Sequence, residues 1–256
     1  MNTEIARKKT PEELELENKE RELAELEELT SERELELATI QAELQHFELE
    51  YLTKVGVLVT ELDALNADIA EKLAAAAPDD PVAQTEAEQA REQASESYRA
   101  TENVDTEGAA ERFVPSDDFK KLFRTAARKY HPDTTTDDRE REERKKIMAE
   151  VNRLYEAGDE EGLQRFLETA GDRPDAIQGE GIAFDIVRAI RKASQLRERL
   201  QEIENLIEAV NENQWFLLRQ EVVKAADEGR DLLEEMAAGL KIEIAQAKAN
   251  LAGLGE

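Results

Sequence analysis

The chain has 256 residues, of which 37% are charged and 5% aromatic, and its formal net charge is −27. This composition is typical of long helices and coiled coils, and it argues against an ordinary globular core. The acidic charge disfavours nucleic acid and anionic membrane surfaces as partners, no apolar run could span a bilayer, and the absence of Cys excludes disulfides and thiolate chemistry.

The first predicted element is a long coiled-coil helix within the segment 1–77. The heptad positions between residues 12 and 73 are Leu16, Leu23, Thr30, Leu37, Leu44, Tyr51, Leu58 and Leu65. Such a heptad predicts a helix whose apolar stripe is covered by another helix. Past Tyr51 the companion apolar positions move by about one residue, so we predict a local shift in the stripe.

A polar connector is predicted at 78–115. Pro78 and Pro81 end the long helix because proline interrupts the backbone hydrogen bonds. Residues 82–115 are rich in Gln, Glu, Ala, Ser and Thr and contain few large apolar side chains. We therefore expect a loosely helical, partly mobile segment.

A strongly basic amphipathic helix is predicted next, although the chain as a whole is acidic. Its basic residues are Lys120, Lys121, Arg124, Arg128 and Lys129. Its apolar residues recur at helical spacing and are the expected core: Phe119, Leu122, Phe123, Ala126 and Tyr130. The tripeptide His131-Pro132-Asp133 follows, and its proline keeps His131 out of the helix, at a helix end or in a loop.

A second helix is predicted after the polar loop 134–138. From Arg139 onward, one face carries Ile147, Met148, Val151, Leu154 and Tyr155. This face can pack against the apolar stripe of the basic helix. Gly158 ends the second helix, and Asp159 can cap a short further helix.

A basic helix that delivers an exposed His-Pro-Asp loop resembles the J-domain, the module by which DnaJ-type co-chaperones activate DnaK-type ATPase chaperones. The resemblance covers 116–170, and the chain looks like a bacterial member with coiled-coil arms. It implies that the basic helix docks on an acidic surface of the DnaK-type nucleotide-binding domain. It also implies that His131, Pro132 and Asp133 contact the region joining that domain to its substrate lobe and promote ATP hydrolysis. The five basic residues would steer and orient the complex.

The chain departs from the J-domain pattern before Ser116. J-domains ordinarily begin with a short aromatic-rich helix, whereas the corresponding stretch here, Thr106–Pro115, does not match it. The first helix is therefore missing, shortened, or replaced by the Ala/Glu-rich segment near Val82–Tyr98.

A linker at 171–181 leads to a second coiled-coil block at 182–256. Between its two apolar stripes, Asn211–Gln214 is either a polar interruption or the turn of a helical hairpin, which we favour. Trp215 and Phe216 are interpreted as core where helices meet, the alternative being an anchor for a partner.

The expected fold class is all-α, with long coiled-coil helices flanking a small J-domain-like helical unit. The stripes Leu16–Ile69 and Ile182–Leu251 are expected to cover each other in an antiparallel bundle within one chain, with His131 exposed. A homodimer formed through the same stripes is the alternative.

The expected function is a co-chaperone and not an enzyme, with arms that hold a client or anchor the protein to an assembly. The alternative is a structural or scaffolding coiled-coil protein whose J-like region has lost its partner. No phosphate-binding loop or nucleophile with a spare His supports catalysis, and His46 has no second ligand at metal-binding spacing, so no cofactor or metal is expected. The N-terminus lacks the pattern of a signal peptide, which favours the cytoplasm.

Overall fold

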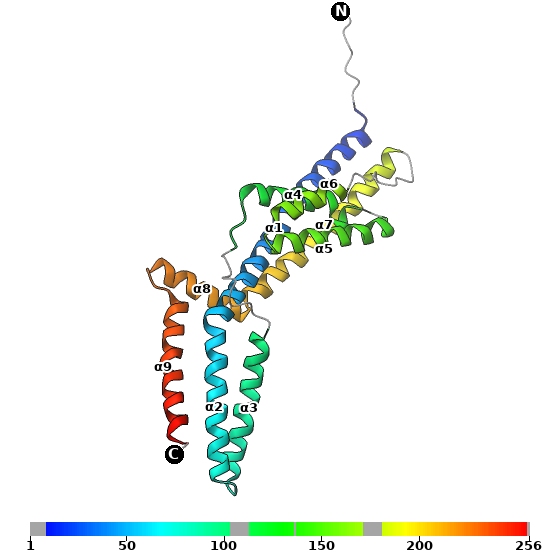
Figure 1. Cartoon of the computed structure of the whole chain (residues 1–256). Helices are drawn as coiled ribbons and strands as arrows, with labels where there is room; N and C mark the ends of the chain where they lie inside the picture. Colours follow the sequence, from blue (N-terminus) through cyan, green and yellow to red (C-terminus); the bar gives the residue numbers. More distant parts are fainter. Residues whose placement is uncertain (1–8, 103–112, 136, 171–180, 255–256) are drawn as a thin grey trace, which may run out of the picture. The chain divides into compact units, whose positions relative to one another are not determined.

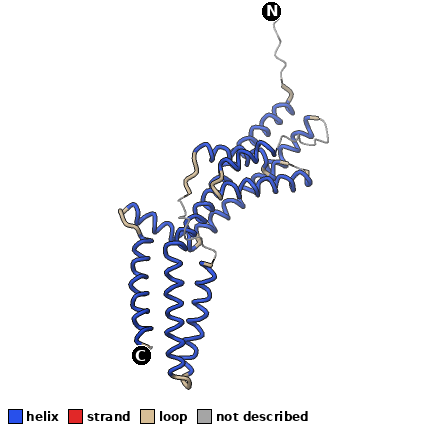
Figure 2. The backbone as a smooth tube through the Cα atoms, viewed as in Figure 1, coloured by secondary structure: helices blue, strands red, loops and turns tan. Residues whose placement is uncertain are grey.

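The computed structural model describes residues 9–102, 113–135, 137–170 and 181–254. Every regular element in these ranges is helical and none is a strand, in agreement with the expected all-α fold class (Figure 2). No helix in the described ranges is both long and apolar enough to cross a membrane. The chain divides into two compact units, unit 1 (Met1–Glu43 and Phe113–Glu212) and unit 2 (Leu44–Arg112 and Asn213–Glu256).

A long N-terminal helix contributes residues to both units. It consists of α1 (Pro11–Tyr51), the π-helical turn η1 (Leu52–Gly56) and α2 (Val57–Ala76), with no non-helical residue between them. A π-turn accommodates one extra residue within a helix. The turn begins directly after Tyr51, where the heptad shifts, so the sequence pattern and the backbone change at the same place.

Unit 1 packs α4 (Asp117–Tyr130), α5 (Asp138–Glu156) and α6 (Glu160–Ala170) around one apolar cluster (Figure 1). Tyr155 lies at its centre, with its ring centroid 4.7 Å from that of Phe119 and 4.6 Å from that of Phe123. Its hydroxyl lies 3.0 Å from that of Thr39 on α1, so the long helix forms one wall of this core.

The other core residues expected in the J-like region divide into two groups. Those at the centre are buried: Ala126, Tyr130, Val151 and Leu154. Leu122 and Ile147 pack against the cluster from its edge and are half-buried. Ala38 and Ala42 of α1 also belong to this cluster.

Local capping explains where these helices begin and end. The Ser116 hydroxyl accepts a hydrogen bond from the Phe119 N–H (2.9 Å), and the Asp137 carboxylate accepts one from the Glu140 N–H (2.8 Å). Gly158 adopts φ +70° after the end of α5, the left-handed conformation that favours glycine at this position. The expected ends of these helices are thereby confirmed.

The C-terminal block begins in unit 1 with α7 (Ile182–Asn211). Figure 1 shows α1 and α7 running in the same direction. Arg197 pairs with Glu22 and Arg199 with Glu34, so α7 lies against α1. The predicted antiparallel pairing of the arms is wrong here, because the start of α7 lies beside the earlier part of α1. Of the predicted linker, 171–180 lies outside the described residues.

In unit 2, the antiparallel partner of α2 is α3 (Pro81–Thr101), a helix within the segment expected to be a loose connector. Ala67 and Ala74 of α2 and Ala87 of α3 are buried small side chains. The Thr60 hydroxyl donates to the Ser97 carbonyl oxygen (3.0 Å) and lies 3.0 Å from the Thr101 hydroxyl. The segment near Val82–Tyr98 therefore packs on α2 and does not supply a first helix to the J-like region. Residues 103–112 lie outside the described ranges.

The rest of unit 2 consists of α8 (Gln214–Asp227) and α9 (Leu232–Gly253). Helix α7 ends and α8 begins at Asn211–Gln214, where an interruption was predicted, and the Asn213 side chain caps α8 through the Trp215 N–H (2.8 Å). The helical hairpin favoured at this position stays a prediction. Trp215 packs edge-to-face on Tyr51 with ring centroids 5.0 Å apart, which supports its interpretation as core. Helix α9 lies along α2 and runs in the same direction, so here too the expected antiparallel order of the arms is wrong (Figure 1).

Candidate functional site

The tripeptide forms the loop that leaves α4. Helix α4 ends at Tyr130, and His131 is extended (φ −60°, ψ 128°), as expected for a residue before proline. Pro132–Thr134 make one 3₁₀ turn, η2, which the Thr134 hydroxyl closes by donating to the His131 carbonyl oxygen (2.7 Å). The loop is thus a defined turn that fixes the direction of the His131 side chain.

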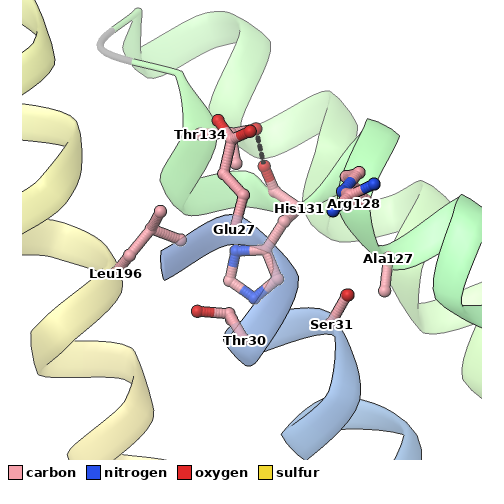
Figure 3. Close-up of a pocket in the computed structure, with 8 residues that line it drawn as sticks. All are labelled: Glu27, Thr30, Ser31, Ala127, Arg128, His131, Thr134 and Leu196. Atoms are coloured by element: carbon pink, nitrogen blue, oxygen red, sulfur yellow. Dashed lines mark hydrogen bonds between the residues drawn. The ribbon is translucent and has the colours of Figure 1, made fainter. Parts of the chain in front are cut away.

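The His131 side chain points into the protein. The residue is only 3% exposed, and Nε2 lies 3.0 Å from Oε1 of Glu34 on α1. Figure 3 shows its ring directed toward the part of α1 that carries Thr30 and Ser31. The expectation that His131 is exposed is therefore wrong, because α1 covers the end of α4 and offers the ring a carboxylate.

The hydrogen bonds of His131 fix which nitrogen carries the proton. The Asp133 N–H donates to Nδ1 (3.2 Å), so Nδ1 acts as an acceptor. In a neutral imidazole the proton is then on Nε2, which donates to Glu34. Both ring nitrogens are therefore used inside unit 1.

Glu34 is the centre of this polar contact. It is 5% exposed, and its Oε1 also accepts a hydrogen bond from Nε of Arg199 on α7 (2.8 Å). Burial raises the pKa of this carboxyl, but hydrogen bonds from His131 and Arg199, with the charge of Arg199, outweigh it and hold the pKa below its usual range. Glu34 is thus a buried carboxylate that His131 stabilises by a hydrogen bond and Arg199 by a hydrogen bond and its charge.

Helix α7 covers the other side of the loop. Leu196 is completely buried beside His131. The Gln195 amide lies between the Asp133 carbonyl oxygen and the Arg141 guanidinium, and with its nitrogen oriented toward Asp133 it donates to that oxygen (3.2 Å) and accepts from Arg141 (3.0 Å). Both the side chain of His131 and the backbone of Asp133 are therefore held by α7 or α1.

A narrow crevice marks the place where α1, the end of α4 and α7 meet (Figure 3). Its lining residues are Glu27, Thr30, Ser31, Ala127, Arg128, His131, Thr134 and Leu196. It has no room for a water molecule, so it is a packed contact between helices and not a small-molecule pocket. Among the described residues, no group of three His, Cys, Asp or Glu side chains is placed to hold a metal ion.

The basic residues of α4 divide between solvent and α1. Lys121 and Lys129 are exposed, and Lys120 and Arg124 are partly exposed. Arg128, although half-exposed, forms an ion pair with Glu28 of α1. The structure thus brings Arg128 together with His131 against α1, while Pro132 and Asp133 remain partly accessible.

Glu34, Gln195 and Arg199 are the site residues that sequence reasoning missed. Glu34 is one of 61 acidic residues in the chain and belongs to no motif. The available signal was its spacing: it lies four residues after Thr30, a polar residue in the apolar stripe, and so shares the inward face of α1. Two polar residues on that face indicate a polar contact but do not identify its partner.

Comparisons of the chain with protein-family models, with curated proteins and with solved structures give no match. The interpretation of this site therefore depends on its residues and their geometry.

Proposed function

We propose that the protein is a J-domain co-chaperone that binds a DnaK-type chaperone and stimulates its ATP hydrolysis in the cytoplasm. One observation carries the proposal. A basic helix and a second helix pack on a shared aromatic core, and the short loop between them holds His131-Pro132-Asp133. The resemblance to J-domains lies in this combination of tripeptide, helix charge and helix pairing.

The charge of α4 supplies a physical basis for docking. Lys121 projects into solvent and Arg124 is partly exposed, on a helix with no acid between Phe119 and Tyr130. In a chain of net charge −27, such a patch would direct an acidic surface to one face. Charge complementarity of this kind mainly increases the association rate and fixes orientation.

The coiled-coil arms are proposed to bind a client or an assembly and bring the chaperone to it, as a monomer or as a homodimer.

A scaffolding protein with a degenerate J-like region is the second candidate. The burial of His131 favours it, because a His131 side chain held permanently inside the protein could not contact a chaperone.

The direct test is steady-state ATP hydrolysis by a DnaK-type chaperone with increasing concentrations of this protein. We expect stimulation by the wild-type chain and its loss in the Lys121→Glu/Arg124→Glu variant. Raised salt should also weaken stimulation, because exposed charges are screened beyond about 8–10 Å. His131→Gln should abolish stimulation, with melting followed in parallel because His131 is buried.

The matched control is Lys224→Glu/Lys241→Glu, which makes the same change in net charge at exposed positions of α8 and α9. This variant should stimulate like the wild type. Loss of activity in both charge-reversed variants would mean that net charge, and not the face of α4, controls binding. Full activity in both would place the docking face elsewhere.

A further inference from the structure

The groups that the proposed function needs are already occupied within unit 1. His131 donates to Glu34, and Arg128 pairs with Glu28. The acidic face of α1 therefore meets the basic helix in the way expected of an acidic partner surface. Glu27 lies on the same face, where burial raises the pKa of its carboxyl and the charges of Lys192 and Arg128 partly offset that effect.

We propose that α1 and α7 form an autoinhibitory clamp over the tripeptide, and that chaperone activation requires Glu34 to separate from His131. The clamp consists of Glu34 on α1 and Gln195, Leu196 and Arg199 on α7. The inference rests on the proposed function and adds its regulation: the described structure is the closed state, in which the His131 side chain cannot reach a chaperone.

The clamp has the features of a contact that can open. Its centre is a set of hydrogen bonds to groups that water can also satisfy, and it lies outside the apolar cluster that holds α4, α5 and α6 together. The buried hydroxyl of Thr30 finds no hydrogen-bond partner in the described structure, which weakens the closed state because solvent would hydrate it on opening. Tyr155 and its aromatic neighbours can keep the J-like helices paired after the loop is released.

Chemical modification of His131 tests the clamp without a chaperone. The chain has two His residues, so diethyl pyrocarbonate labelling followed by mass spectrometry compares His131 with His46 in unit 2 as an internal reference. In the wild type His131 should react slowly. Glu34→Ala should increase its rate several-fold relative to His46, whereas Glu32→Ala, at an exposed position of the same helix, should leave the ratio unchanged.

A reversible lock tests the consequence for activity. Ser31 and Ala127 line the same crevice from α1 and α4, and a chain without native Cys allows Ser31→Cys/Ala127→Cys to be joined selectively by oxidation to a disulfide, which needs no room for a linker. The joined form should not stimulate the chaperone, and reduction should restore stimulation to the wild-type level. Glu34→Ala should stimulate several-fold more than the wild type and Glu32→Ala. If Glu34→Ala fails to fold, the difference in stimulation between the locked and reduced forms still shows whether the clamp must open.

The outcomes separate the two proposals. Fast labelling of His131 in the wild type, or equal stimulation by locked and reduced forms, would overturn the clamp and leave the proposed function standing. Stimulation by none of the chains, including Glu34→Ala, would overturn the proposed function. The labelling ratio would still show whether Glu34 covers His131.

Discussion

Glu34 is the residue whose ionisation is most closely tied to the site. Its pKa is held below the usual value of 4.5, so its paired charge stabilises the folded state. A carboxyl with a depressed folded pKa contributes this stability above its unfolded pKa and loses it as the pH falls through the folded pKa. The contribution is therefore present at neutral pH and disappears in the acid range below 4.5.

This pH dependence of stability gives a prediction for Glu34→Gln, which keeps an acceptor oxygen but removes the charge. The variant should have a lower free energy of unfolding than the wild type at neutral pH, and the difference should shrink as the pH falls toward about 3. Urea unfolding followed by circular dichroism across this range measures it. Glu32→Gln is the control, and its free energy of unfolding should differ little from that of the wild type at every pH. If the difference for Glu34→Gln did not change with pH, Glu34 would not be a buried, ionised carboxylate.

At this same scale, helical periodicity predicts Phe119, Phe123 and Val151 as core because burying an apolar face leaves a regular trace in the sequence. It also places Tyr155 on the packed face, although not at the centre of the cluster. Polar pairing leaves no such trace. The bond between Glu34 and His131 joins residues 97 positions apart, and nothing local in either segment specifies the other.

At the scale of elements, α3 shows that few large apolar residues do not imply loose packing. Small side chains at helical spacing let two helices approach closely, so α3 packs on α2 without a Leu or Phe of its own. The same composition predicted a loose connector, because a packed helix was expected to bury large apolar side chains. In contrast, the π-turn and the helix caps have local signals, the shift in the heptad and Ser, Asp or Gly at the ends, and were predictable.

The close contact of α2 and α3 predicts that added bulk is harmful at one position and tolerated at another on the same helix. Ala87→Leu should lower the free energy of unfolding of unit 2 by about 1–3 kcal/mol, because a buried site with a small residue cannot accept a large one without moving the helices. Ala100→Leu, at an exposed position, should change it by less than about 0.5 kcal/mol.

The fluorescence of Trp215 during urea unfolding measures both variants, because it is the only Trp in the chain and belongs to the apolar cluster of unit 2. Equal stability of the two variants would mean that α3 is not packed on α2 in solution. Such a result would restore the interpretation of this segment as a loose connector.

At the scale of the whole molecule, the sequence predicted that apolar stripes of both arms are covered, but it did not predict the direction in which the helices run. Periodicity identifies a face and is unchanged when a helix is reversed. Direction depends on where the preceding segment ends: α7 and α9 both run with the long helix, and α3, after a short turn, runs against α2. Each pairing nevertheless lies within one of the two units.

Pairing within one chain is the remaining prediction at this scale. In unit 2, Nζ of Lys248 lies 2.6 Å from Oε1 of Glu61, so a zero-length carbodiimide reagent should join α9 to α2. The experiment mixes isotopically heavy and light chains under conditions that allow exchange before the reagent is added. We expect the Lys248–Glu61 product mostly as heavy–heavy or light–light pairs, because both residues belong to one compact unit. If heavy–light pairs were as frequent as like pairs, this contact would be formed between chains. The homodimer would then replace the monomeric arrangement, and α9 would cover the α2 helix of a second copy.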